Sequence, residues 1–265
     1  MPIIQVPYRQ VPACLYHYTS GDASFSIISS GRGKNEEICF WLKNALQKND
    51  EAELRLGTSL IEGLQHYMRD CKRSSLVSEV RIDPKLVFIN SFTETANVSP
   101  HMLKEYGCFR LEFDFRRNPY RSDIHECTYF RDEDISELME CYRSTFENDW
   151  PHISGDSKDI AALVDYLLQE MSAIRSIPLL KHVERWGLEN EWRHVLHQQE
   201  NDPRVFTLIN GTPRMRVYYP ADSLIGITCF MSKDNKGNVL SNYYRIKHWV
   251  RKNNWDTRVR IVAID

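Results

Sequence analysis

The chain has 265 residues, of which 42% are hydrophobic and 26% charged, with a formal net charge of -2. This composition is ordinary for a globular protein and excludes a disordered or collagen-like chain. No apolar run approaches the roughly 18 residues of a spanning helix, and no secretory signal pattern opens the sequence. We therefore expect a cytoplasmic protein without membrane contact. The near-neutral charge gives no global basic field that would attract nucleic acid.

Seven cysteines are scattered along the chain without the close spacing of a zinc ribbon or a redox motif. Several of them lie in strand-like apolar runs, where cysteine acts as a small core residue. Reduced, buried thiols are the simplest interpretation. The nine histidines show no metal-ligand spacing, so no metal site is predicted.

In the first part of the chain, apolar and polar patterning predicts two strands and two helices. They are a strand over 12–19, a helix over 23–31, a strand over 38–43 and, after a polar loop at 44–50, a helix of about twenty residues. Ser20 or Asp22 can cap the first helix, and Gly31 suits its C-terminal end.

The middle of the chain combines two strands with a series of helices. The run 86–93 predicts a buried strand, and Ser99 to Tyr106 a short helix after Pro100. Residues 108–115 alternate apolar and charged side chains, which is typical of a strand with one solvent-exposed face. Helices are then predicted at about 132–147, 156–173 and 174–184.

Strands dominate again toward the C-terminus. Four are predicted over 191–197, 204–209, 214–219 and 224–230, followed by a helix over 241–252 and a last strand over 258–264. Strands at both ends with helices between them, without regular βαβ alternation, favour a mixed, largely antiparallel α+β fold. We expect a single domain over 1–265 with a helical insertion at about 132–184.

The first candidate site lies at the end of the first predicted strand. His17 and Thr19 face one side of that strand, and Tyr16 and Tyr18 face the other. An imidazole and a hydroxyl two residues apart form a compact hydrogen-bonding platform for a ligand. The alternative is a core histidine that is bonded to a neighbouring carbonyl group.

The second candidate site joins an aromatic strand to the polar loop after it. Trp41 can stack on a planar ligand ring, and Asn49 and Asp50 follow in the loop. The alternative is that Trp41 packs in the core while Asn49 and Asp50 cap the following helix.

The third candidate site is the segment from Trp186 to Arg193. Glu191 and Arg193 share one face of the predicted strand, which indicates either a surface ion pair or a carboxylate that stabilises developing positive charge. No phosphate-binding loop, dinucleotide-binding glycine turn, zinc-protease motif or hydrolase elbow is present.

Together, the three segments resemble a bacterial family of unassigned activity, domain of unknown function 2971, in their order along the whole chain. The matching positions are Tyr16-His17-Tyr18-Thr19, Trp41, Asn49-Asp50-Glu51-Ala52-Glu53, Ser91-Phe92-Thr93-Glu94, the segment Met102 to Phe115, and Lys181, Trp186, Glu189, Glu191, Trp192 and Arg193.

That family is in turn similar to the ADP-ribosyltransferase fold, a split, largely antiparallel sheet that binds NAD. His17, Thr19, Ile27, Ile28 and Gly31 match its first strand and helix. The resemblance implies that His17 bonds the adenosine ribose, Tyr18 holds the nicotinamide amide through its backbone, and Trp41 or Phe40 stacks on nicotinamide. Glu191 would be the catalytic residue that bonds the nicotinamide ribose. The other NAD-binding positions implied are Thr19, Asn49, Asp50, Ser91, Thr93 and Arg193.

The resemblance implies an enzyme that uses NAD as a substrate and transfers ADP-ribose to a protein or nucleic-acid acceptor. Such an enzyme would suit a toxin or a phage-defence effector, with an antitoxin or defence-system partner. Two alternatives stay open: a non-catalytic nucleotide- or partner-binding module of the same fold, and an NAD glycohydrolase. The sequence departs from the transferase pattern at Tyr18, where glycine is usual.

Overall fold

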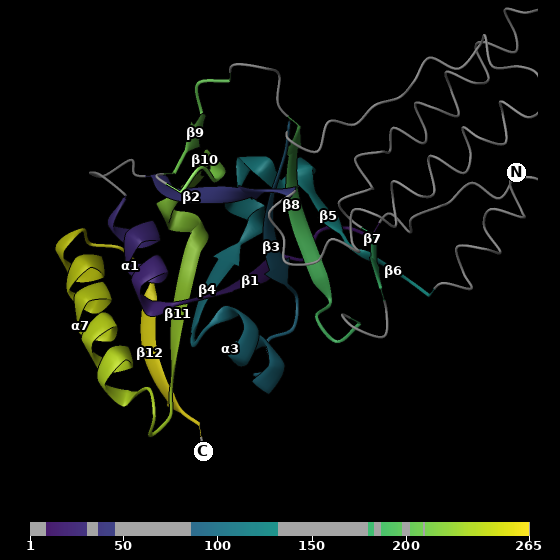
Figure 1. Ribbon diagram of the computed structural model, residues 1–265. Coiled ribbons are helices and arrows are strands. Elements are labelled where there is room, and N and C mark those ends of the chain that lie inside the picture. Colours follow the sequence, from purple (N-terminus) through teal and green to yellow (C-terminus); the bar gives the residue numbers. More distant parts are fainter. Residues whose placement is uncertain are drawn as a thin grey trace, which may run out of the picture.

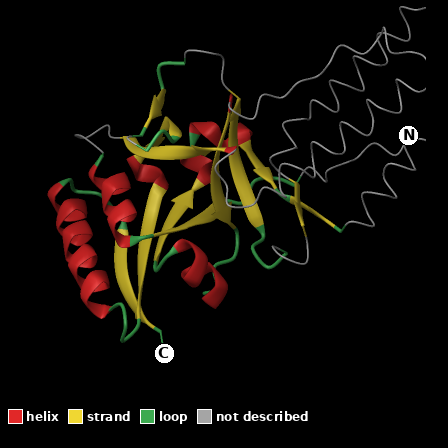
Figure 2. Cartoon of the chain, in the orientation of Figure 1, coloured by secondary structure: helices red, strands yellow, loops and turns green. Residues whose placement is uncertain are grey.

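The computed structural model describes residues 9–30, 37–45, 86–131, 180–182, 187–197, 202–208 and 210–264. These residues form a mixed α+β fold (Figures 1 and 2). The helices are α1 (Gly21–Ser29), α3 (Pro100–Tyr106) and α7 (Lys236–Lys252). The strands are β1 (Cys14–Thr19), β2 (Glu37–Asn44), β3 (Val87–Thr93), β4 (Phe109–Asp114), β5 (Ile124–Glu126), β6 (Thr128–Phe130), β7 (Leu180–His182), β8 (Glu191–His197), β9 (Val205–Thr207), β10 (Pro213–Pro220), β11 (Leu224–Met231) and β12 (Arg258–Ala263).

Ten of these strands form one open sheet in the order β12-β11-β4-β1-β3-β2-β10-β9, with β8 pairing β3 and β5. All of its neighbouring strands are antiparallel except β11 and β12. β6 and β7 form a separate, parallel pair. The prediction of a mixed, largely antiparallel α+β fold is therefore confirmed for the described residues.

One face of the sheet is the apolar core. Leu15, Leu111 and Phe113 point to this face, where Ile28 of α1 and Ile246 of α7 pack against them. Figure 1 shows α1 and α7 side by side on the β11–β12 side of the sheet. Burial of these apolar side chains contributes roughly 25 cal/mol per Å² of surface removed from water, which makes this face the main source of stability.

The other face of the sheet carries buried charge. On β4, Arg110, Glu112 and Asp114 alternate with the core residues, and all three are buried. The prediction that this strand has one solvent-exposed face is therefore wrong. Arg110 Nη2 donates to Glu112 Oε1 at 3.0 Å, and Thr228 Oγ1 donates to the same oxygen at 2.9 Å. These bonds offset part of the cost of burying the charges.

Local sequence signals set the helix ends. The side chain of Ser20 accepts a hydrogen bond from the Ala23 amide, so Ser20 is the cap of α1. Ser99 caps α3 in the same way, and Pro100 occupies its first turn, where no amide proton is needed. α7 begins at Lys236, five residues before the predicted start at 241.

The helix predicted over 174–184 is wrong at 180–182, because Leu180–His182 is strand β7, paired with β6. The rest of that helix, the other helices of the insertion at about 132–184, and the long helix after Asp50 lie almost wholly outside the described residues. The described cysteines Cys14, Cys39, Cys108, Cys127 and Cys229 are free thiols. Within the described part of the chain, no helix is long and apolar enough to cross a membrane.

Candidate functional site

A turn and three neighbouring strands position the third candidate segment. Thr93 of β3 lies opposite Tyr16 of β1 on one side and opposite Glu191 of β8 on the other, so these side chains share one face of the sheet. Asn190 precedes Glu191 with a φ of 44°, a left-handed conformation that asparagine tolerates. Thr93 Oγ1 donates to the Glu189 carbonyl oxygen at 2.6 Å and anchors the turn.

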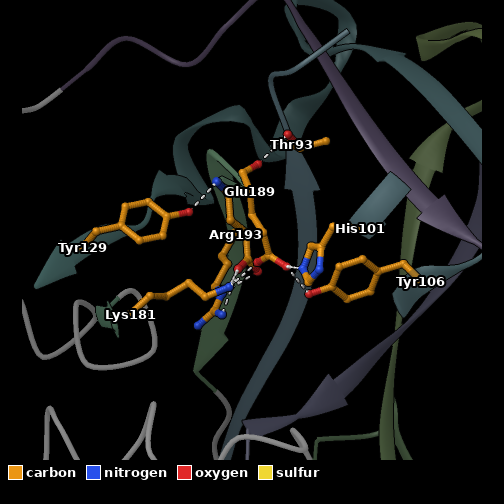
Figure 3. Close-up of polar contacts among 8 residues, drawn as sticks. Thr93, His101, Tyr106, Tyr129, Lys181, Glu189 and Arg193 are labelled. Atoms are coloured by element: carbon orange, nitrogen blue, oxygen red, sulfur yellow. Dashed lines mark hydrogen bonds and ion pairs between the residues drawn. The ribbon is translucent and has the colours of Figure 1, made fainter. Parts of the chain in front are cut away.

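Glu189 directs its carboxylate toward Lys181 (Figure 3). The carboxylate of Glu191 contacts the same cation. The Nζ of Lys181, on β7, lies 2.5 Å from Glu189 Oε2 and also contacts Glu191 Oε2. Arg193 Nε donates to Glu191 Oε1 at 2.7 Å, and its Nη2 donates to Oε2 at 3.0 Å. We call Lys181, Glu189, Glu191 and Arg193 the charge cluster.

All four members of the charge cluster are buried. Two carboxylates balance two cations, so the cluster carries no net formal charge. Removing a charged group from water costs several kcal/mol per ion, and close pairing with hydrogen bonds offsets that cost. The cluster therefore holds both carboxylates fixed in orientation.

Residues of α3 border the charge cluster on the side of Glu189. The Tyr106 hydroxyl donates to Glu189 Oε1 at 2.6 Å, and His101 Nε2 lies 3.4 Å from the same oxygen. Tyr106 is 38% exposed. Tyr106 therefore links the buried Glu189 Oε1 to the protein surface.

Tyr129 contacts the cluster through the backbone. Its hydroxyl accepts a hydrogen bond of 2.8 Å from the Glu191 amide, and burial raises the pKa of this hydroxyl. A neutral hydroxyl at this point fixes the start of β8 without adding charge beside the carboxylates.

His17 lies on the opposite side of β1 from Tyr16. Its ring centroid is 5.3 Å from that of Phe40 and 5.7 Å from that of Phe92, and its Nδ1 lies 2.8 Å from the Ser91 carbonyl oxygen. Because a carbonyl oxygen can only accept, Nδ1 carries the proton and Nε2 is the acceptor of the neutral ring. Burial lowers the pKa of His17 to about 4, so the ring is neutral at physiological pH.

The His17 bond lies in a break between two strand ladders. β8 pairs β3 along its whole length, so β1 and β2 share the other edge of β3. β1 meets this edge at Thr93, and β2 meets it at Ile89 and Phe88. Residues 90–92 lie between these two contacts, and there the imidazole of His17 spans from β1 to the Ser91 carbonyl.

The structure thus brings together four of the predicted site residues, Ser91, Thr93, Glu191 and Arg193. It places His17 and Thr19 toward the other side of β1, while Tyr18 is buried and stacks on Phe230. Ser91, on β3, lies opposite Arg193, and Phe40 packs against His17. Trp41 is 53% exposed and contacts Phe206 of β9. Asn49 and Asp50 lie outside the described residues.

Four residues of the site were not among the predicted catalytic or binding positions: Lys181, Glu189, His101 and Tyr106. Lys181 and Glu189 are visible in the sequence as parts of the late motif. His101 and Tyr106 carry no sequence signal, since they belong to a short helix far away in the chain. Among the described residues, no group of three or more histidine, cysteine or acidic side chains is arranged to hold a metal ion.

The arrangement provides two fixed carboxylates and a polar edge that reaches solvent. A carboxylate that is fixed in this way can stabilise positive charge that develops beside it in a transition state, and here Lys181 and Arg193 balance the two carboxylates before a substrate binds. Comparisons of the chain with protein-family models, with curated proteins and with solved structures found no significant match.

Proposed function

We propose that the chain is an NAD-dependent, ADP-ribosyltransferase-like enzyme that transfers ADP-ribose to a protein or nucleic-acid acceptor. The observation that carries the proposal is the convergence of Glu189 and Glu191 on Lys181, beside a side chain that reaches solvent. Two fixed carboxylates two residues apart suit a reaction in which positive charge develops on a sugar ring.

In this reaction the bond between the ribose C1′ and the nicotinamide nitrogen breaks, and its electron pair leaves with nicotinamide. The ribose then carries positive charge shared between C1′ and the ring oxygen, which Glu191 would stabilise. The acceptor nucleophile bonds to C1′, and its proton passes to a base. Glu189 is the candidate base, because its Oε1 faces the edge next to Tyr106. Lys181 and Arg193 are positioning residues that hold Glu191.

The tautomer of His17 supports the predicted contact with the adenosine ribose. With its proton on Nδ1, the ring offers Nε2 as an acceptor, and a ribose hydroxyl is a suitable donor. His17 and Glu191 lie on opposite sides of the sheet, so a single NAD molecule that contacts both would have to reach from one sheet face to the other.

The test is incubation of the purified protein with NAD labelled on its adenylate phosphate, with and without host lysate. We expect the wild-type protein to release nicotinamide and to label a macromolecule. Glu191→Gln should abolish both, and Glu189→Gln should reduce label transfer more than nicotinamide release. Glu105→Gln, an exposed substitution on α3, is the matched control and should leave both unchanged.

If the protein neither releases nicotinamide nor transfers label under any acceptor condition, the proposal that it is an enzyme is refuted. The result would then favour a non-catalytic binding module, for which one observation speaks: Arg193 and Lys181 already occupy both oxygens of Glu191. Free ADP-ribose and nicotinamide in equal amounts, with no labelled macromolecule, would instead identify an NAD glycohydrolase.

A further inference from the structure

The β2–β10 ladder carries a row of exposed aromatic and cationic side chains. Trp41 lies opposite Arg216, Lys43 opposite Arg214, and Cys39 opposite Tyr218. Partners that lie opposite each other share a face, and here they alternate with buried core residues. Phe206 of β9 lies opposite Arg214 and joins the same face. We call Trp41, Lys43, Phe206, Arg214, Arg216 and Tyr218 the aromatic–cation patch.

The aromatic rings of the patch are open to solvent. Trp41 is 53% exposed and Tyr218 40% exposed, although both are large apolar side chains. The Arg216 guanidinium lies 4.4 Å from the centroid of the Phe206 ring, and the Trp41 ring centroid lies 5.2 Å from that of Phe206. These contacts hold the planar groups in place and leave the outer surface of Trp41 accessible.

The charge of the patch has one sign. Lys43, Arg214 and Arg216 contribute three cations, and the acidic Glu37 on this face of the ladder lies at its other end, opposite Pro220. Partial burial and the neighbouring charge of Arg214 lower the pKa of Lys43. Lys43 and Arg214 thus place two like charges opposite each other on this face.

The patch and the charge cluster lie on the same face of the sheet. Lys43 lies opposite Ile89, which is four residues before Thr93 on β3 and points the same way. Thr93 in turn lies opposite Glu191. The patch and Glu191 are therefore on one sheet face, with the buried Ile89 between them.

We infer that the aromatic–cation patch binds single-stranded nucleic acid, with phosphates at Lys43, Arg214 and Arg216 and a base stacked on Trp41. Unpaired bases expose the faces that stack on aromatic rings, whereas a duplex hides them. An acidic protein would use the cations but gain little from the rings. If the proposed function holds, on which this step rests, the bound strand is the acceptor of ADP-ribose.

The experiment measures fluorescence anisotropy of a short, labelled, single-stranded oligonucleotide with the full chain, over a series of salt concentrations. We expect Trp41→Ala to weaken binding roughly tenfold, since one stacked base is lost. Arg216→Gln should weaken binding and lower the slope of log affinity against log salt by about 0.7, the value for one phosphate contact on a single strand.

The matched controls lie on α7. Tyr244→Ala removes another exposed aromatic side chain, and Arg251→Gln another exposed cation. Both controls should bind as the wild type does, and thermal melting should show that all four variants are folded.

The inference fails if the wild type does not bind the oligonucleotide, if duplex DNA or polyglutamate competes as well as the single strand does, or if the α7 variants lose as much affinity. Nicotinamide release is measured on the same samples. Turnover of NAD without oligonucleotide binding would overturn this inference and leave the proposed enzyme intact. Oligonucleotide binding without NAD turnover would overturn the proposed enzyme and leave this inference intact.

Discussion

His17 Nδ1 donates a hydrogen bond of 2.8 Å to the carbonyl oxygen of Ser91. The bond joins β1 to β3 in the break between the β1 and β2 ladders, where a strand neighbour would otherwise provide the donor. This bond to a part-buried carbonyl group gives the histidine a structural role in addition to any role in binding. The two roles use different ring nitrogens and can be separated by mutation.

Substitutions of His17 should separate stability from NAD binding. In His17→Asn the amide nitrogen can replace Nδ1 as donor to Ser91, whereas His17→Leu leaves that carbonyl without its donor. We expect His17→Leu to lower the free energy of unfolding by about 1–3 kcal/mol more than His17→Asn does. Both variants lose Nε2, so calorimetry should show weakened NAD binding in both. Equal loss of stability in the two variants would contradict the assigned bond.

A second histidine, His194, should make the folding stability depend on pH. His194 is fully buried, its Nδ1 lies 2.6 Å from the Tyr219 hydroxyl, and burial lowers its pKa to about 3. Because its unfolded value is about 6.5, the unfolded chain binds more protons between these values, and folding stability falls as pH decreases below about 6.5. The free energy of unfolding should fall by up to about 1.4 kcal/mol per pH unit from this group.

Urea unfolding at a series of pH values between neutrality and pH 4 measures this dependence. His17 contributes in the same direction, because its pKa is also lowered, to about 4. His194→Asn removes the titrating group, so its profile should be shallower than that of the wild type even if the variant is less stable overall. Parallel profiles would show that His194 is not buried as a neutral ring.

Much of the fold follows from local sequence signals. Strand-like sequence runs predict β1, β3 and β8. The cap, Ser20 or Asp22, predicts the start of α1, and Pro100 predicts the start of α3. The three-residue strands β5, β6 and β7 were not predicted, because so short a segment is a strand only through its partner. The alternating pattern of β4 suggested water on one face, yet that face is covered and its charges pair with one another.

The site depends more strongly on the strand order. The alternation of side chains along β1 shows that His17 and Tyr16 face opposite sides of the sheet. That Tyr16 shares its side with Glu191 follows only from the position of β3 between β1 and β8. Tyr106 contacts Glu189 across a separation of 83 residues, which no local pattern encodes.

Removing the shared cation of the charge cluster should destabilise the protein strongly. Lys181→Met leaves the Glu189 and Glu191 carboxylates buried beside each other with less positive charge. Loss of one partner of a buried ion pair costs about 3–5 kcal/mol, so we expect a decrease of this size in the free energy of unfolding. Urea denaturation of the purified variants measures it.

A double variant tests whether that loss arises from electrostatic coupling. In Lys181→Met/Glu189→Gln one of the two facing negative charges is also gone, so part of the lost stability should return. A double-mutant cycle gives the coupling free energy between the two positions. Additive effects would show that Lys181 and Glu189 do not interact in solution.

Substitution by alanine should change the free energy of unfolding in opposite directions at two glycines, one at the end of α3 and one in α7. Gly107 ends α3 with a φ of 117°, and a Cβ atom there would lie 2.5 Å from the Thr19 carbonyl oxygen. Gly107→Ala should therefore lower the free energy of unfolding by more than about 1 kcal/mol, because both the backbone angle and the contact with β1 oppose it. Gly237, within α7, has open space around it, and Gly237→Ala should raise stability by roughly 0.5–1 kcal/mol through its helix propensity. Thermal and urea unfolding measure both changes. Gly107 also sets the position of Tyr106 against Glu189, so Gly107→Ala should reduce NAD turnover as well. Gly237→Ala should leave turnover unchanged. Equal stability and equal turnover in the two variants would show that α3 is not held against β1.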